Sequence, residues 1–371
     1  MTQNTIQNST QNTNETDQTT VAQQYAHLRR TVGVYAPAAG LVSVTGLERG
    51  LVLGRILARE SEYVEPNTAR DSLILDPDGG VWDAVVHIEL DDASWLVSQS
   101  RSDLADLVRT AAQDLDEVAV FDAGEAGEAG EAGDALDPDA AGGAYTAVAF
   151  EGPAAWRIAA LLVDFEVSSL VLHGATAVEL AAGGAGVLAR IGSTGEFGYL
   201  LIAPRSAGAA DWVLEQAAAL GGGAVQAPAL ARVRAEARHP QIPAYSRGLT
   251  VREAGLEWLV GWNREDEFRG AAALAGLPDP EQGLIHLTAP SGTAPAVGTA
   301  VHAGGQVVGA VREVFATVDT ADDLVLGLLA KPFDVPGLTL RGTGPDGAAV
   351  ALRTVSAPVV VPLSWSERIG G

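Results

Sequence analysis

Two side chains capable of acid–base chemistry, Asp83 and His87, stand four residues apart in a segment with the composition of a β-strand. Because alternate residues of a strand share a face, these two would lie on one side and could act as a general acid–base pair. A hydrogen-bonded structural pair is the alternative. Trp82, Ala84 and Val86 fall on the opposite side, where they would form an apolar wall suited to an aromatic substrate. Trp82 could equally be a core residue.

Further candidates lie in the second half of the chain. Arg234 could bind an anionic group, or it could form a structural ion pair with Glu236 or Glu253. Glu196 lies in a glycine-flanked turn, which needs the glycines but not the carboxylate, so we favour a functional role for it. His239 is expected in a loop, either exposed to solvent or at the site.

Composition limits the chemistry further. The 371 residues carry 23 Lys and Arg against 47 Asp and Glu, a net charge of −24, which disfavours unaided binding to nucleic acid or to an anionic membrane. The chain has no cysteine, which excludes thiol nucleophiles and disulfides, and its six scattered histidines predict no metal site. No apolar run reaches the roughly 18 residues of a membrane span, and the first residues lack signal-peptide features. These observations predict a cytoplasmic protein that acts on a small molecule.

The elements that must position these residues follow from the pattern of apolar side chains. An amphipathic helix is predicted over residues 21–30, and residues 72–75 and 81–90 form a predicted hairpin around a Pro-Asp-Gly-Gly turn. From 284 to 352, short apolar strands alternate with Gly and Pro turns, which is typical of an all-β module. We therefore predict an α+β fold followed by a small C-terminal barrel or jelly roll.

Three regions are predicted along the chain. Residues 1–20 are rich in Asn, Gln and Thr, and they should form a disordered tail because they have too few apolar side chains to offset the entropy of ordering. Residues 21–278 form the α+β region, interrupted by an acidic loop at 124–143 that contains a Gly-Glu-Ala repeat. Residues 279–371 form the predicted barrel domain.

Seven short blocks of the sequence, in order, resemble those of the glycine-cleavage T-protein (aminomethyltransferase) superfamily, whose relatives include folate-dependent demethylases. Each block alone is a weak signal, but the shared order covers most of residues 21–371. The blocks are 25–35 (YAHLRRTVGVY), 79–84 (GGVWDA), 150–153 (FEGP, like VQGP), 193–199 (STGEFGY), 233–237 (VRAEA), 251–258 (VREAGLEW) and 305–311 (GQVVGAV).

The resemblance implies a T-protein-like multi-domain folate-binding fold with tetrahydrofolate as cofactor. It implies that four residues bind the cofactor, namely Glu196, Arg234, Glu236 and Glu253. It implies a catalytic role for Tyr245, which falls where the family has a site-lining tyrosine, beside Asp83 and His87. Substrate contacts would come from Trp82, Tyr199, Trp258 and His239.

Three departures from the family pattern affect the chemistry. The second Asp of the family's GGVIDD, its catalytic acid, is Ala84 here. The family's Glu that holds the pterin ring aligns with Leu200, and the Tyr that opens YTGEDG is Ser193. A pterin needs a carboxylate against its 2-amino-pyrimidinone edge and a proton donor near the reacting nitrogens. Another carboxylate, from Glu196, Glu236 or Glu253, would have to replace the missing one.

Three functions remain open at this point. The first is a one-carbon (methyl or aminomethyl) transferase or demethylase that acts on a small, for example aromatic, substrate with tetrahydrofolate as acceptor. The second is a folate-independent lyase or isomerase that uses the same cavity. The third is a non-catalytic binding subunit beside a partner enzyme that supplies or consumes the one-carbon unit.

Overall fold

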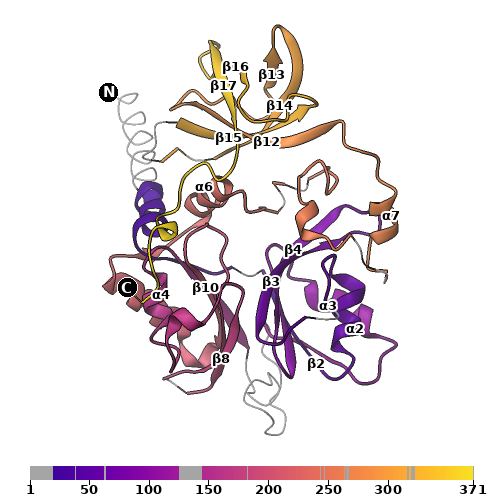
Figure 1. Ribbon diagram of the computed structural model, residues 1–371, viewed down its shortest axis with the longest axis vertical. Coiled ribbons are helices and arrows are strands. Elements are labelled where there is room, and N and C mark those ends of the chain that lie inside the picture. Colours follow the sequence, from indigo (N-terminus) through magenta and orange to yellow (C-terminus); the bar gives the residue numbers. More distant parts are fainter. Residues whose placement is uncertain are drawn as a thin grey trace, which may run out of the picture.

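The computed structural model describes residues 20–370 apart from 38, 62–63, 125–143, 182, 243, 246, 263, 265–266, 316 and 319–321. The predicted tail, except Thr20, and the predicted acidic loop, except Gly124, lie outside the described residues. Residues 20–30 are helical, as the amphipathic pattern indicated. Two sheets, a barrel and connecting helices follow within the described part (Figure 1).

The first sheet is antiparallel, and helices α2 and α3 cover one of its faces. Leu53 of α2 and Val108 of α3 pack with Val42 and Leu96 of the sheet in one buried cluster. Burial of each such side chain stabilises the fold by about 1.5–3 kcal/mol. The predicted hairpin is present as β3 and β4. The sheet order is β3-β4-β5-β2-β6, and the elements are β2 Gly40–Thr45, α2 Arg49–Ile56, β3 Thr68–Leu75, β4 Val81–Glu89, β5 Ala93–Ser98, α3 Leu104–Ala112 and β6 Ala119–Asp122.

The second sheet is mixed, since β1 pairs in parallel with β11 and all its other pairs are antiparallel. Helices α4 and α5 cover its outer face, where the Phe150 and Tyr199 rings stack with centroids 5.6 Å apart. The order is β11-β1-β7-β10-β9-β8, and the elements are β1 Gly33–Tyr35, β7 Tyr145–Glu151, α4 Ala155–Ala159, β8 Ala175–Glu179, β9 Ala185–Ala189, β10 Gly198–Pro204, α5 Ala209–Ala219 and β11 Gly223–Ala224.

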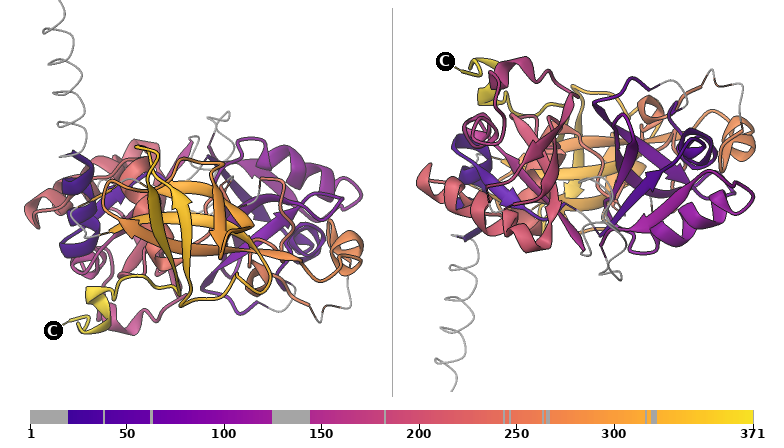
Figure 2. Two further views of the ribbon diagram at one scale, coloured as in Figure 1. Left: turned by 90° about the horizontal axis from the view of Figure 1, so that it is seen from above. Right: turned by 90° about the horizontal axis from the view of Figure 1, so that it is seen from below.

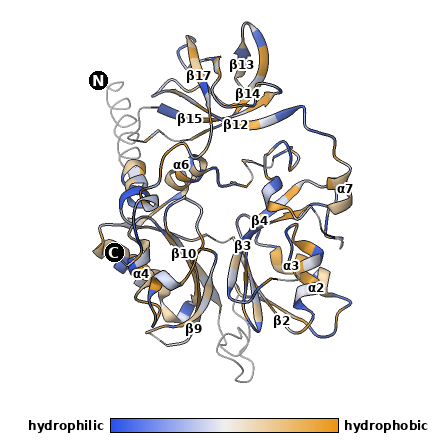
Figure 3. Ribbon diagram, in the orientation of Figure 1, coloured by the Kyte–Doolittle hydropathy of each residue, from blue (hydrophilic) through white to orange (hydrophobic). Residues whose placement is uncertain are grey.

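The C-terminal module is a closed antiparallel barrel, so the predicted α+β fold with a C-terminal barrel is confirmed. Its strands alternate inward and outward residues, as in β17, and Figure 3 shows apolar and polar residues mixed along them. The order is β12-β15-β14-β13-β16-β17, and the strands are β12 Gln282–Pro290, β13 Ala300–Ala303, β14 Gln306–Phe315, β15 Asp322–Ala330, β16 Thr339–Thr343 and β17 Ala349–Val355.

The two sheets stand side by side with the barrel above them (Figures 1 and 2), and shared hydrophobic clusters join the three parts. One cluster contains Trp95 of the first sheet and Leu200 of the second. Another joins Leu73 of the first sheet to Tyr245 and to Leu326 of the barrel. The connecting elements are α6 Ala227–Ala237, η3 Glu257–Leu259 and α7 Ala271–Ala275, and η4 Leu363–Trp365 follows the barrel.

Within the described residues, none of the helices combines the length and apolar character needed to cross a membrane. The predicted domain boundary at 278/279 falls shortly before β12 begins at Gln282. The cytoplasmic location stays a prediction.

Candidate active site

A cavity lies between the facing sides of the two sheets. β4 contributes Ala84 and Val86 to its wall, and β10 contributes Leu200 from the opposite side. The cavity volume is about 60 Å³, which is space for about four water molecules. The polar residues of the lining are Tyr35, Asp71, Ser72, Gln99, Glu151, Ser193, Arg234 and His239.

Glu151, at the end of β7, is a buried carboxylate surrounded by donors. The backbone N–H groups of Ser193 and Thr194 each donate to Oε2 at 2.9 Å, and both hydroxyls and the Tyr35 hydroxyl donate as well. Gly192 allows this close wrap, since a Cβ there would lie 2.9 Å from Oε2 of Glu151. These five donors exceed the roughly four lone-pair positions of a carboxylate, so Glu151 has no free acceptor for a ligand.

Asp71, on β3, lies on the wall that also carries Ala84. Across the β3–β4 pair, Asp71 is opposite Val86 and Leu73 is opposite Ala84. Asp71 is therefore on the same face as Ala84, two residues along β3 from the residue that pairs with it. Its backbone carbonyl accepts a hydrogen bond from Arg59, but its carboxylate has no partner among the described residues. Burial raises the pKa of Asp71 to about 6; the nearby charges of Arg59 and Arg234 oppose this rise and that of Glu151 adds to it. The cavity therefore holds a carboxyl group that can exchange a proton near neutral pH.

Arg234 and His239 meet the cavity from the end of α6 and the loop after it. Arg234 Nε donates to Ser193 Oγ at 3.0 Å, and the guanidinium carbon lies 5.3 Å from the centroid of the Tyr35 ring. The terminal Nη groups of Arg234 donate to none of the described residues. Burial, with the charge of Arg234, lowers the pKa of His239 to about 3, so the imidazole is neutral at pH 7. Arg234 and His239 are the predicted site residues that the structure brings to the cavity.

The predicted Asp83–His87 pair is not formed. Both side chains point to the helix-covered face of the first sheet, away from the cavity wall of Ala84 and Val86. Asp83 accepts hydrogen bonds from the Ser98 hydroxyl and from the N–H and hydroxyl of Ser100. His87 Nε2 lies 3.1 Å from a carboxylate oxygen of Glu89. Burial lowers the pKa of His87 and raises that of Asp83, without contact between them.

The predicted apolar wall lacks Trp82, and the predicted substrate contact Tyr199 does not line the cavity either. A bulge in the β3–β4 pair places Trp82 on the helix side, where the guanidinium carbon of Arg101 lies 4.5 Å from its ring centroid. Tyr199 precedes Leu200 on β10 and so faces the outer core, with its hydroxyl unpaired. Val86 does line the cavity, as expected.

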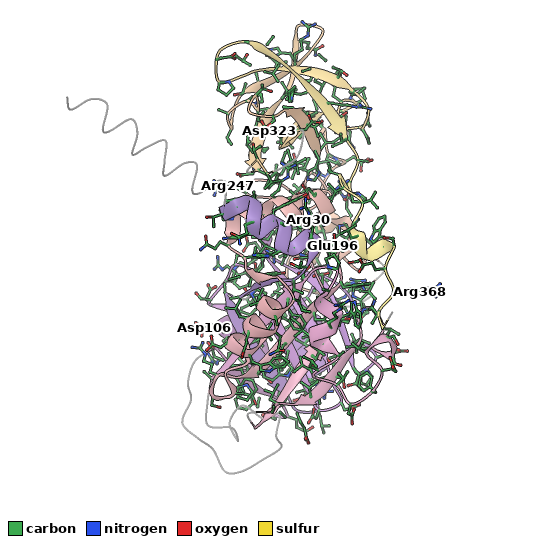
Figure 4. The ribbon with its side chains drawn as sticks, turned by 90° about the vertical axis from the view of Figure 1, so that its left-hand side faces the viewer. Arg30, Asp106, Glu196, Arg247, Asp323 and Arg368 are labelled. Carbon is green, nitrogen blue, oxygen red and sulfur yellow. The ribbon has the colours of Figure 1, made fainter. Side chains whose placement is uncertain are left out.

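Two predicted cofactor ligands, Glu196 and Glu236, lie in a buried network beside the cavity and not in its lining. Glu236 accepts hydrogen bonds from Arg29 and Arg232, each at 2.8 Å. Glu196 accepts from Arg29 at 3.2 Å and from the N–H and hydroxyl of Ser364 at 3.0 and 2.7 Å, where the C-terminal segment passes it (Figure 4). Their carboxylates therefore hold the chain together at this point.

The remaining predictions also lie outside the cavity. Glu253 accepts from the Thr250 N–H at 2.9 Å and from Gln282 Nε2 at 2.8 Å, which fixes a loop against the barrel. Tyr245 is buried, and its hydroxyl lies 3.0 Å from His286 Nε2 of β12. Trp258 on η3 is 53% exposed.

Asp71, Glu151 and Tyr35 line the cavity but were not among the predicted residues. Glu151 was visible as the Glu of FEGP, where the family block has Gln. Asp71 could have been found once position 84 was assigned to the cavity, because the hairpin places residues 71 and 73 beside 86 and 84.

Comparisons with known proteins agree with this architecture. The family model described as the GCVT N-terminal domain matches residues 4–264. The chain belongs to the T-protein (GCVT) family. An aminomethyltransferase of Streptomyces coelicolor is 29% identical over 327 residues, covering 86% of this chain and 83% of that protein. One from Cutibacterium acnes is 30% identical over 304 residues, covering 76% and 75%.

A solved structure of the glycine cleavage system aminomethyltransferase T from Bartonella henselae has the same fold. It superposes with a TM-score of 0.72 at 19% identity and covers 92% of this chain and 90% of that one. The T-protein fold is therefore shown.

The two positions at which the family resemblance predicts a carboxylate, Ala84 and Leu200, each have a carboxylate nearby on the adjacent strand. Asp71 stands beside the position of Ala84, as described above. On β7, Ala149 pairs with Leu200 and Glu151 pairs with Gly198, so Glu151 stands beside the position of Leu200. The cavity retains two acidic side chains, but both come from different strands than in the family pattern.

Proposed function

We propose that this T-protein family member is an enzyme that transfers or removes a one-carbon group on a small molecule bound in the central cavity, with Asp71 as its acid–base group. The unpaired Asp71 carboxylate on the cavity wall supports the proposal most directly. A carboxyl group whose pKa lies near 6 is present in both protonation states around neutral pH, as proton transfer to and from a substrate requires. The family relationship supports one-carbon transfer as the reaction class.

Tetrahydrofolate is the cofactor that the family implies, but the residues present do not fit it in the family's manner. Leu200 offers no acceptor to the pyrimidinone edge, and the neighbouring Glu151 already accepts from Tyr35, Ser193 and Thr194. A buried polar edge left unpaired would cost about 1–3 kcal/mol per group.

This mismatch supports a second candidate, a folate-independent lyase or isomerase in which Asp71 performs the same proton transfer. The third possibility from the sequence, a binding subunit beside a partner enzyme, stays a prediction.

Titration of the purified full-length chain with tetrahydrofolate, followed by tryptophan fluorescence, separates the two enzyme proposals. Leu200→Glu returns a carboxylate to the family position, so it should bind tetrahydrofolate at least about tenfold more tightly than the wild type. Product analysis with a panel of methylated amines, with and without tetrahydrofolate, then measures transfer. Asp71→Asn should abolish it, and Asp106→Asn, an exposed acid on α3, should not.

Transfer that survives Asp71→Asn would contradict the acid–base assignment. If tetrahydrofolate neither binds nor accepts a one-carbon unit up to about 1 mM, the proposal of folate-dependent transfer is wrong. The result would then support the folate-independent lyase or isomerase.

A further inference from the structure

Two groups of opposite charge face the cavity with unpaired ends. The carboxylate of Asp71, on β3, has no hydrogen-bond partner among the described residues. The two Nη groups of Arg234, at the end of α6, likewise donate to none of the described residues. The charge of Arg234 acts to lower the pKa of Asp71, and no ion pair joins the two side chains among the described residues. Both residues line the cavity, Asp71 from β3 of the first sheet and Arg234 from the end of α6.

Elsewhere around the cavity, the fold pairs its buried charges. Glu236 is paired with Arg29 and Arg232, and Glu151 with five donors. A charge removed from water without a partner is strongly unfavourable, so such pairing is what a purely structural role produces. Asp71 and Arg234 are only half-buried, and their unpaired ends lie at the cavity, where a ligand can pair with them.

We propose that the cavity binds a short zwitterion, a molecule with a protonated amine at one end and a carboxylate at the other. The Nη edge of Arg234 offers two parallel N–H donors, which match a carboxylate in bidentate geometry. Asp71 accepts from the N–H groups of the amine. Ala84, Val86 and Leu200 would contact the carbon atoms between the two ends. The small volume restricts the spacer to a few carbons.

The inference rests on the proposed function, because it places the amine of the substrate against the proposed acid–base group. When Asp71 takes a proton from the ammonium, the carboxylate becomes a neutral carboxyl group and the nitrogen regains its lone pair. Returning that proton restores both charges. His239 is neutral at pH 7 and so adds no positive charge that would repel the amine.

Isothermal titration calorimetry on the full-length chain at pH 7.5 tests this directly. The probes are alanine, β-alanine and 4-aminobutyrate, which carry both charges at increasing spacing, and propionate and ethylamine, which carry one charge each. We expect at least one zwitterion to bind about tenfold or more tightly than both single-charge analogues, since each charged end adds a charge-assisted hydrogen bond. The comparison of ligands on the unaltered protein decides the question even if a variant fails to fold.

Variants then assign each end of the ligand. Asp71→Asn should weaken the best zwitterion to the level of propionate and leave propionate binding unchanged. Arg234→Gln should weaken it to the level of ethylamine. Glu179→Gln, an exposed change on β8, should alter neither.

Equal binding of zwitterions and single-charge analogues, or no binding up to about 10 mM, would overturn the inference. Transfer detected on a substrate without a carboxylate would overturn it while leaving the proposed function intact. Selective zwitterion binding without any turnover would support the inference and count against the proposed function.

Discussion

At the scale of single residues, Asp71 is a half-buried carboxyl whose ionisation destabilises the folded state at neutral pH. Its pKa is about 6 in the folded chain against 3.8 for an ordinary Asp, so the native state binds more protons between these values. Stability should therefore fall as pH rises from about 4 to about 6 and stay reduced above that range. Asp71→Asn, which cannot ionise, should be more stable than the wild type at pH 7.5 by about 1–2 kcal/mol, a value discounted for partial exposure.

Urea unfolding at pH 7.5 and 4.5 measures this effect, and the difference should shrink at the lower pH. Asp106→Asn serves as the exposed control. An Asp71→Asn variant that is less stable at both values would show that Asp71 has a structural partner after all.

Replacing Glu151 should destabilise the protein, in contrast to Asp71, because the Glu151 carboxylate accepts hydrogen bonds from five donors. Glu151→Gln keeps the shape but turns an amide NH₂ toward N–H donors of Ser193 and Thr194. We expect a loss of about 2–3 kcal/mol, the range for a charged hydrogen-bonding group removed from a buried network. Thermal unfolding at pH 7.5 would measure it, with Glu179→Gln on the exposed side of β8 as the matched control. Unchanged stability would mean that the hydroxyls reorient to satisfy the amide.

At the scale of the element, β10 separates two environments by alternation alone. Leu200 faces the cavity, and Tyr199 faces the helix-covered core with a hydroxyl that has no hydrogen-bond partner among the described residues. Removing an unpaired buried hydroxyl removes a desolvation cost, so Tyr199→Phe should leave stability unchanged or raise it by up to about 1 kcal/mol. Ligand binding measured by calorimetry should not change. A loss of binding in Tyr199→Phe would restore the substrate contact that the family resemblance implied.

Alternation also explains how far the sequence could predict the site. It correctly separated Asp83 and His87 from Ala84 and Val86 on β4. It failed at Trp82 because Leu75 pairs with Val81 while Ile74 pairs with Asp83, and the extra residue reverses the direction of the tryptophan. Such a bulge depends on the partner strand and has no local signature.

The same dependence hid the acidic residues that do line the cavity. The element types, the order of the motifs and the closed barrel could be predicted, since they follow from periodicity and turn residues. The roles of Glu196 and Glu236 could not, because their partners Arg29 and Ser364 lie more than 160 residues away in the chain. Asp71 reaches the cavity through the pairing of β3 with β4, and its position can be deduced only from the register of that pair.

At the scale of the whole molecule, the segment after the barrel returns to the second sheet and fastens there. Ser364 Oγ donates to Glu196 at 2.7 Å and accepts from the Phe197 N–H at 2.9 Å, and the Val359 N–H donates to the Glu236 carbonyl at 2.8 Å. Ser364→Ala should lower stability by about 1–2 kcal/mol, since it removes a charge-assisted hydrogen bond at a buried site. Ser366→Ala, an exposed change two residues on, should have little effect in the same urea titration.

If the segment only covers the surface, the two serine variants will unfold alike. If it couples the barrel to the sheets, Ser364→Ala will also broaden the transition, because the two parts then lose part of their cooperativity.

The register of β3 with β4 and of β7 with β10 has a consequence for how relatives of this chain are sorted. A family sequence profile scores each position separately, so Ala84 and Leu200 would mark this chain as one that lacks the acidic residues of the site. The cavity nevertheless contains carboxylates on the adjacent strands, at Asp71 and Glu151. Relatives with both substitutions can therefore be sorted by whether they carry acids at the neighbouring positions. Those that carry them should be screened for new substrates, and only those that do not should be set aside as emptied folds.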